Sequence, residues 1–195
     1  MRRMALSALL SVIFFTVVLG LGYGLAFTGV AQVLFPGKAD GSKVSLAGKV
    51  VGSSLIAQEF GGREYFQPRP SQTGYSPNTT YFSNRGPNSV EAREEVRERL
   101  AGYLRLNKPF DRSLTAKAVP VDAITTSGSG VDPEISEANA RIQARRVAAV
   151  RKLPLAEVER LISDHTNGRF LGVFGEPGVN VLELNIALDK EGPVR

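Results

Sequence analysis

The sequence predicts a single N-terminal transmembrane helix followed by one soluble α+β domain, in which helices pack on a mostly antiparallel sheet. A long apolar run, Met4–Phe27, provides the first element. Capped amphipathic patterns farther along the chain predict helices, and apolar residues at alternate positions of Asn180–Asp189 predict a strand. The order of helix, strand segments, helices and strands is typical of the α+β class.

The run Met4–Phe27 is long enough to cross a membrane as one helix. No charged residue lies between Arg3 and Lys38, and a helix rises about 1.5 Å per residue against roughly 30 Å of hydrocarbon. A cleaved signal peptide is the alternative, but its apolar core usually spans roughly 7 to 15 residues and is followed by a small-residue cleavage site. We therefore expect a retained anchor in contact with membrane lipid, with the tail and helix in 1–36 and the soluble domain in 37–195.

Charges on both sides of the helix bear on its orientation. Arg2 and Arg3 precede the helix, and basic residues favour the cytoplasmic side of a membrane. Lys38, Lys43 and Lys49 follow the helix and weaken this asymmetry. The flanking charges therefore favour a cytoplasmic N-terminus and an extracytoplasmic domain, by a smaller margin than the two arginines alone would give.

Two glycines on one side of the predicted helix are candidates for helix packing. Gly20 and Gly24 are four residues apart, and small residues at this spacing let a second membrane helix approach closely. The alternative is that glycine is simply frequent in membrane helices. Both interpretations stand on the sequence alone.

The first part of the soluble domain is expected to be irregular. The segment Lys38–Gly48 is polar and rich in glycine, which predicts a short connector. The segment Lys49–Phe60 predicts a strand or a short helix. Asn, Ser, Thr, Gly and Pro dominate Ser71–Ser89 without periodicity, so we expect a long surface loop that is either a binding loop or a mobile segment.

Helices and strands are expected to alternate after this loop. The predicted elements are a helix capped by Asn88 or Ser89 and ending near Leu104, a strand at Ala118–Thr126, helices at Glu137–Lys152 and Pro154–His165, and a strand at Asn180–Asp189. Serine caps, a proline in a first turn and apolar residues every three to four positions support the helices. Period-two alternation supports the last strand.

Composition excludes several classes of function. The chain has 195 residues with 24 basic and 19 acidic side chains, which is a mixed surface, and no nucleic-acid partner is expected. Cysteine is absent, so disulfides, thiolate nucleophiles and zinc–thiolate sites are excluded. A single histidine leaves only carboxylates as metal ligands, and no metal site is predicted.

The most suggestive loop lies between the strand predicted to end at Thr126 and the helix predicted from Glu137. Ser127, Gly128, Ser129 and Gly130 could expose backbone amides to a phosphate, so they are candidate nucleotide contacts. The run lacks the lysine and the spacing of a P-loop. The alternative, which we favour, is that the glycines supply turn conformations before the next helix.

A hydrolase triad can be drawn but is not supported locally. His165 could pair with Ser127 or Ser129 and with Asp122 or Asp132. The sequence has no G-x-S-x-G element, and a histidine in the last turn of a helix more often compensates the helix dipole. We therefore predict no catalytic residue.

Several segments together resemble one family, the C subunits (KdpC) of Kdp potassium-transporting P-type ATPases. They occur in the expected order over nearly the whole chain. The segments are Thr28–Gln32, Leu34–Pro36, Gly52–Gln58, Tyr65–Ser71, Ser127–Pro133, His165–Thr166, Leu171–Gly172, Gly175–Pro177 and Val179–Asn185. The chain departs from the family pattern at Tyr75–Asn84, Glu134 and Glu137, so any contact that the family makes there is in question.

The resemblance implies a non-catalytic accessory subunit of a high-affinity potassium uptake complex in the cell inner membrane. Its implied partners are a channel-like potassium-translocating subunit, a P-type ATPase subunit and a small single-span subunit. The complex uses ATP and potassium, whereas no cofactor is expected on this chain. The implied role is to stabilise assembly and to act as a catalytic chaperone that raises nucleotide affinity. The alternative hypothesis is a free-standing membrane-anchored enzyme or nucleotide-binding module using the 127–130 loop.

Overall fold

The computed structural model describes residues 1–76, 78–79, 81, 83–86 and 88–192. It divides into two compact units, Met1–Lys43 and Val44–Arg195, which we describe separately. The predicted surface loop Ser71–Ser89 has no helix or strand among its described residues; Pro77, Thr80, Phe82 and Pro87 of this loop lie outside them.

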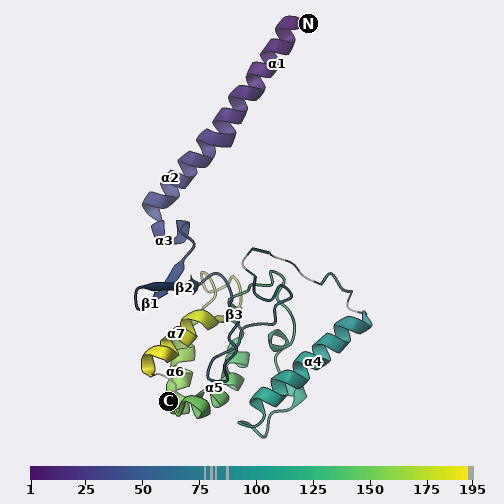
Figure 1. The fold of residues 1–195 in the computed structure, drawn as a ribbon, viewed down its shortest axis with the longest axis vertical. Helices are drawn as coiled ribbons and strands as arrows, with labels where there is room; N and C mark the ends of the chain where they lie inside the picture. The colour runs from purple at the N-terminus through teal and green to yellow at the C-terminus, as the bar shows by residue number, and fades with distance from the viewer. Residues whose placement is uncertain (77, 80, 82, 87, 193–195) are drawn as a thin grey trace. The chain divides into compact units, whose positions relative to one another are not determined.

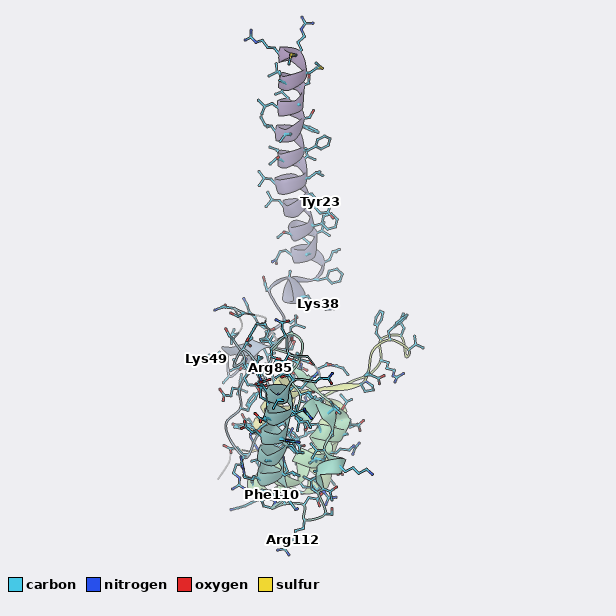
Figure 2. The ribbon with its side chains drawn as sticks, turned by 90° about the vertical axis from the view of Figure 1, so that its right-hand side faces the viewer. Tyr23, Lys38, Lys49, Arg85, Phe110 and Arg112 are labelled. Carbon is cyan, nitrogen blue, oxygen red and sulfur yellow. The ribbon has the colours of Figure 1, made fainter. Side chains whose placement is uncertain are left out.

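The N-terminal unit is dominated by a long apolar helix, as predicted. Helix α1 (Arg2–Phe15), a π-helical stretch (Thr16–Tyr23) and α2 (Gly24–Leu34) follow one another without a break and form a 33-residue candidate membrane span. Its side chains point away from the helix on every side in Figure 2, and none is buried. Pro36 then begins the short helix α3 (Pro36–Ala39).

A two-stranded sheet opens the second part of the chain. Strands β1 (Lys43–Leu46) and β2 (Lys49–Ser53) pair through a tight turn. Ala47 and Gly48 occupy this turn with φ of 49° and 79°, the positive values that two-residue hairpins favour. Of the two elements predicted for Lys49–Phe60, the strand is the one that forms.

Four helices build the core of the second unit. They are α4 (Val90–Asn107), α5 (Glu137–Arg151), α6 (Leu155–Asp164) and α7 (Val181–Glu191). Figure 1 shows α5 between α4 on one side and α6 and α7 on the other. Ser89 and Ser136 cap α4 and α5 by accepting the amides of Ala92 and Asn139, so these two predicted starts are confirmed.

A small antiparallel sheet lies beside these helices. Strand β5 (Gly178–Asn180) is central, between β3 (Glu134–Ile135) and β4 (Thr166–Asn167). Val179 of β5 is opposite Ile135 on one neighbour and Thr166 on the other. The α+β class is therefore confirmed, although the strands are only two to five residues long.

Two predicted strands are wrong. Most of Asn180–Asp189 is helix α7, because Asn180 caps it by accepting the amide of Glu183. The alternating apolar residues form two i,i+4 pairs, Leu182 with Ile186 and Leu184 with Leu188, and all four are buried because the helix is covered on most sides. The predicted strand Ala118–Thr126 is instead two short 3-10 turns, since the proline between them has no N–H for a ladder.

The largest apolar side chain at the centre of the core comes from outside the helices. Phe66 is fully buried and packs in the same cluster as Val147, Ile162 and Leu184. It lies in the segment Arg63–Pro70, which begins with a turn at Arg63 and Glu64 and belongs to neither sheet; we call it the extended segment. The position of this segment therefore determines how the helices pack.

Replacing Phe66 tests this role. We expect Phe66→Ala to lower the free energy of unfolding by about 3 to 5 kcal/mol, because it leaves a cavity among the helices. Val121→Ala, at an exposed position, is the control and should change stability by less than about 0.5 kcal/mol. Denaturant unfolding of the full chain in detergent measures both; equal effects would contradict the assigned packing.

Candidate functional site

The extended segment Arg63–Pro70 is held by amide side chains in place of a neighbouring strand. Asn185 of α7 accepts the amide of Phe66 at 2.8 Å and donates to its carbonyl at 2.9 Å. Gln143 of α5 does the same for Gln67, at 2.8 and 3.0 Å. Both side chains are only 1% exposed. This pattern copies the paired bonds of an antiparallel ladder and fixes the segment against two helices.

A buried arginine completes the binding of this segment. Arg146 of α5 is fully buried and donates to the carbonyl oxygens of Arg63 and Tyr65, and to the side-chain oxygens of Asn107 and Gln143. Burial lowers the pKa of Arg146 to about 10. Its charge is stabilised by neutral oxygens, which accept hydrogen bonds from the N–H groups on different sides of the planar guanidinium.

A second arginine attaches the start of the segment to α7. Arg151 donates to the carbonyl of Glu64 at 2.8 Å and forms an ion pair with Asp189 at 2.7 Å. Its guanidinium also lies over the ring of Tyr65, 4.8 Å from the centroid. The side chain is almost completely buried, so these contacts are shielded from solvent.

A polar network extends from Gln143 to the 3-10 turn that contains Asp122. Gln143 donates to Asn139, which donates in turn to Asp122 at 3.0 Å. Asp122 also accepts the amide and the hydroxyl of Ser136, at 2.9 and 2.8 Å. Tyr103 of α4 donates to Asn139 at 2.8 Å, and burial raises the pKa of this phenol. The network joins α4, α5 and the turn into one rigid body.

The candidate nucleotide loop is attached to the end of the extended segment. The amide of Ser127 donates to the carbonyl of Pro70 at 3.3 Å, that of Gly130 donates to Ser127, and that of Val131 donates to the Ser129 hydroxyl. Ser127 is buried, whereas Gly128 and Ser129 are exposed. Only Gly128 and Ser129, among the four candidate contacts, keep amides that no other described residue accepts.

Gly130 has a steric role in this loop. Its φ is +76°, and a Cβ at this position would lie 3.0 Å from Oγ1 of Thr73. Its carbonyl accepts the hydroxyl of Ser71 at 2.5 Å. At the end of the loop, Arg69 and Asp132 form an ion pair at 3.1 Å. A side chain at position 130 would be strained where the loop approaches Ser71–Thr73, so the turn interpretation fits Gly130, whereas Gly128 has no positive φ.

The residues of the hypothetical triad are engaged elsewhere. Nδ1 of His165 lies 2.8 Å from the carbonyl of Leu161 in its own helix, and Asp132 pairs with Arg69. Among the described residues, no hydrogen bond joins His165 to the candidate serines or to Asp122. Nor does the described part of the chain hold a cluster of three or more residues suited to a metal ion.

A groove of about 350 Å³ lies over the extended segment. Tyr75 contributes to its wall and donates to the carbonyl of Arg69 at 3.0 Å. Burial, with a smaller effect from Glu59, raises the pKa of Tyr75 to about 12. The remaining lining residues are Glu59, Phe60, Gly61, Gln67, Pro68, Pro70, Arg99, Gly102, Tyr103, Leu106, Ala123 and Gln143.

The two candidate packing glycines leave open surface on the membrane helix. A Cβ built on Gly20 or Gly24 would meet no other atom within 4 Å. Gly20 lies in the π-helical stretch and Gly24 begins α2. Within the N-terminal unit, no atom lies within 4 Å of either added Cβ apart from the backbone of the helix itself, so a second helix could approach there.

Sequence reasoning missed the residues that hold the extended segment. Asn139, Gln143 and Asn185 are polar, yet each is buried on the inner side of a helix. A polar amide within an otherwise apolar helix face was the available signal, because buried polar groups are normally hydrogen-bonded.

Comparisons with known proteins identify the family of this chain. Residues 5–190 match the model of the family KdpC: K+-transporting ATPase, c chain. The potassium-transporting ATPase KdpC subunit of Mycobacterium tuberculosis H37Rv is 47% identical over 193 residues, covering 97% of this chain and all of that protein. Subunits of the same name from Caulobacter sp. K31 and Beijerinckia indica are 49% and 44% identical, covering 95% and 96% of this chain and 93% and 94% of those proteins.

A long apolar helix that could span a membrane, followed by a small α+β domain, is typical of a membrane-anchored protein. The family match makes this class specific. The chain belongs to the KdpC family and is an accessory subunit of a potassium-transporting ATPase, not its catalytic subunit.

The half-buried phenols of Tyr75 and Tyr103 predict a loss of stability in alkali. Their pKa values are raised by folding, so their contribution is complete below about pH 10 and is lost as the pH rises toward the folded values. We expect Tyr75→Phe to flatten the fall in unfolding free energy between about pH 10 and 12. Tyr81→Phe, at an exposed tyrosine, is the control, and denaturant melts across this range measure both. An unchanged slope in Tyr75→Phe would contradict the burial of this phenol.

Proposed function

We propose that this chain stabilises the assembly of a high-affinity, ATP-driven potassium uptake complex. Its partners would be a channel-like potassium-translocating subunit, a P-type ATPase subunit and a small single-span subunit. Family membership over residues 5–190 is the observation that carries this proposal. The rigid polar network around the extended segment supports it, since a preformed domain loses little entropy when it binds.

The proposal includes a location for each part of the chain. Residues 1–36 would form the cytoplasmic tail and a single-pass anchor in the inner membrane, and residues 37–195 an extracytoplasmic domain. The apolar helix Arg2–Leu34 and the basic residues Arg2 and Arg3 before its core support this orientation.

Purification from the native membrane tests the assembly role. We expect an affinity tag on this chain to recover a P-type ATPase subunit and a potassium-channel-like subunit in fixed ratio, because the chain is one component of their complex. Detergent extraction followed by mass spectrometry measures the recovered proteins. Recovery of the chain alone would contradict the proposal.

The same purification tests the membrane contact through Gly20 and Gly24. A leucine at both positions would fill the open surface beside the helix, so we expect Gly20→Leu/Gly24→Leu to reduce recovery of the partners about tenfold. Ala8→Leu enlarges another exposed small residue of this helix and is the matched control. Equal recovery of the partners from both variants would contradict a role for Gly20 and Gly24 in the contact.

We further propose that the chain acts as a catalytic chaperone, raising the nucleotide affinity of the complex. A direct contact of the Ser127–Gly130 loop with nucleotide is the alternative to the extracytoplasmic placement above, because ATP is cytoplasmic. It would use the amides of Gly128 and Ser129, since the other two are donated within the domain. The oppositely charged Arg69 and Asp132 neutralise each other at the end of this loop. The contact would therefore depend on backbone amides rather than on net positive charge.

Two substitutions at Ser129 distinguish the role of its backbone amide from that of its hydroxyl. We expect Ser129→Pro to weaken binding of an ATP analogue to the purified complex about tenfold if the loop holds phosphate, because proline has no N–H. Ser129→Ala keeps the amide and removes the same hydroxyl, so it should bind as the unmodified protein does. Equal affinities for both variants, with the complex intact, would exclude a loop contact.

A further inference from the structure

The turn between β4 and β5 exposes an unusual group of apolar side chains. In this apolar hairpin, Arg169–Glu176, the exposed fractions are 72% for Phe170, 75% for Leu171, 68% for Val173 and 62% for Phe174. No charged residue lies among the six from 170 to 175. Figure 2 shows the yellow-green segment between α6 and α7 projecting from the body of the domain. A contiguous apolar projection of this kind marks an interaction surface.

The hairpin is preformed. Phe170 and Phe174 exchange backbone hydrogen bonds of 2.8 and 3.0 Å, and their rings lie 6.5 Å apart. The amide of Gly172 donates to the carbonyl of Arg169, and that of Val173 donates to Phe170. Since its own backbone bonds hold the turn, docking would require little additional ordering.

Leu171 is strained as well as exposed. Its φ is +52°, a left-handed conformation that glycine or asparagine adopts at lower cost than leucine. A water-exposed leucine in this conformation contributes nothing to the fold that a glycine would not. An unfavourable backbone combined with an exposed apolar side chain indicates a binding role for that side chain.

Charge and area restrict what can cover the hairpin. Its base carries the Arg169–Glu176 ion pair, and Glu134 bonded to Asn167, which together give one positive and two negative charges. A net negative base disfavours anionic lipid headgroups. The four side chains expose on the order of 500 Å², compared with roughly 800 Å² per partner in a standard interface, too little to hold a second copy alone.

We propose that the apolar hairpin inserts into an apolar pocket with a polar rim on the extramembrane surface of another subunit of the same transporter. This inference rests on the proposed function and names the hairpin as the part of the domain that contacts the other subunit. The membrane helix would hold the chain near its partner, so a small second contact would suffice. The two phenylalanines and Leu171 would be the anchors, and the ion pair would form the rim.

The test uses two variants with matched chemistry. Leu171→Asn/Val173→Thr removes apolar surface from the tip, and asparagine also suits the left-handed backbone. Leu55→Asn/Val121→Thr makes the same changes at two other exposed positions. Each full-length chain is co-expressed with the partner subunits, and complex recovery is measured through a tag on the ATPase subunit, with circular dichroism as the check on folding.

We expect the tip variant to reduce recovery of the complex at least about fivefold while the control matches the unmodified chain. If the tip variant recovers as much complex as the unmodified chain, the inference is overturned but the proposed function stays intact. Equal recovery combined with lost flotation on phosphatidylglycerol-containing vesicles would assign the hairpin to lipid instead, and would also overturn it. Failure of the unmodified chain to assemble would overturn the proposed function and this inference together.

Discussion

The paired hydrogen bonds from Asn185 and Gln143 to the extended segment are the interaction on which the rest of the domain depends. Each amide satisfies both backbone groups of one residue, at 2.8 to 3.0 Å. Without these partners the buried groups would each cost about 1 to 3 kcal/mol. The bonds also place the ring of Phe66 at the centre of the helical core, so one set of contacts satisfies the polar backbone and positions the largest apolar residue.

The extended segment also fixes the Ser/Gly loop, Ser127–Gly130. Pro70, at the end of the segment, accepts the amide of Ser127, and Arg69 pairs with Asp132, so both ends of the Ser/Gly loop are attached to the same backbone. Gly130 allows the loop to approach closely enough for the hydroxyl of Ser71 to reach its carbonyl. A loop built in this way serves as a fixed surface, which agrees with an accessory subunit better than with a mobile catalytic element.

Sequence features close to an element predicted that element correctly where they alone determine it. The membrane helix and the starts of α4 and α5 follow from apolar length and from the caps Ser89 and Ser136. Helix α7 was mistaken for a strand because burial on most sides places apolar residues at consecutive even positions, which imitates period two. The amide contacts of Gln143 and Asn185 could not be predicted, since their partners are 76 and 119 residues away in the chain.

The proposed role of this accessory subunit is to hold the other subunits together, while ATP hydrolysis occurs on a different subunit. Potassium-stimulated ATP hydrolysis, measured for the purified partner subunits with and without this chain, tests that claim most directly. We expect no hydrolysis by the chain alone and restored, potassium-dependent hydrolysis when it joins its partners. Hydrolysis by the chain alone, or full activity of the partners without it, would contradict the proposed role.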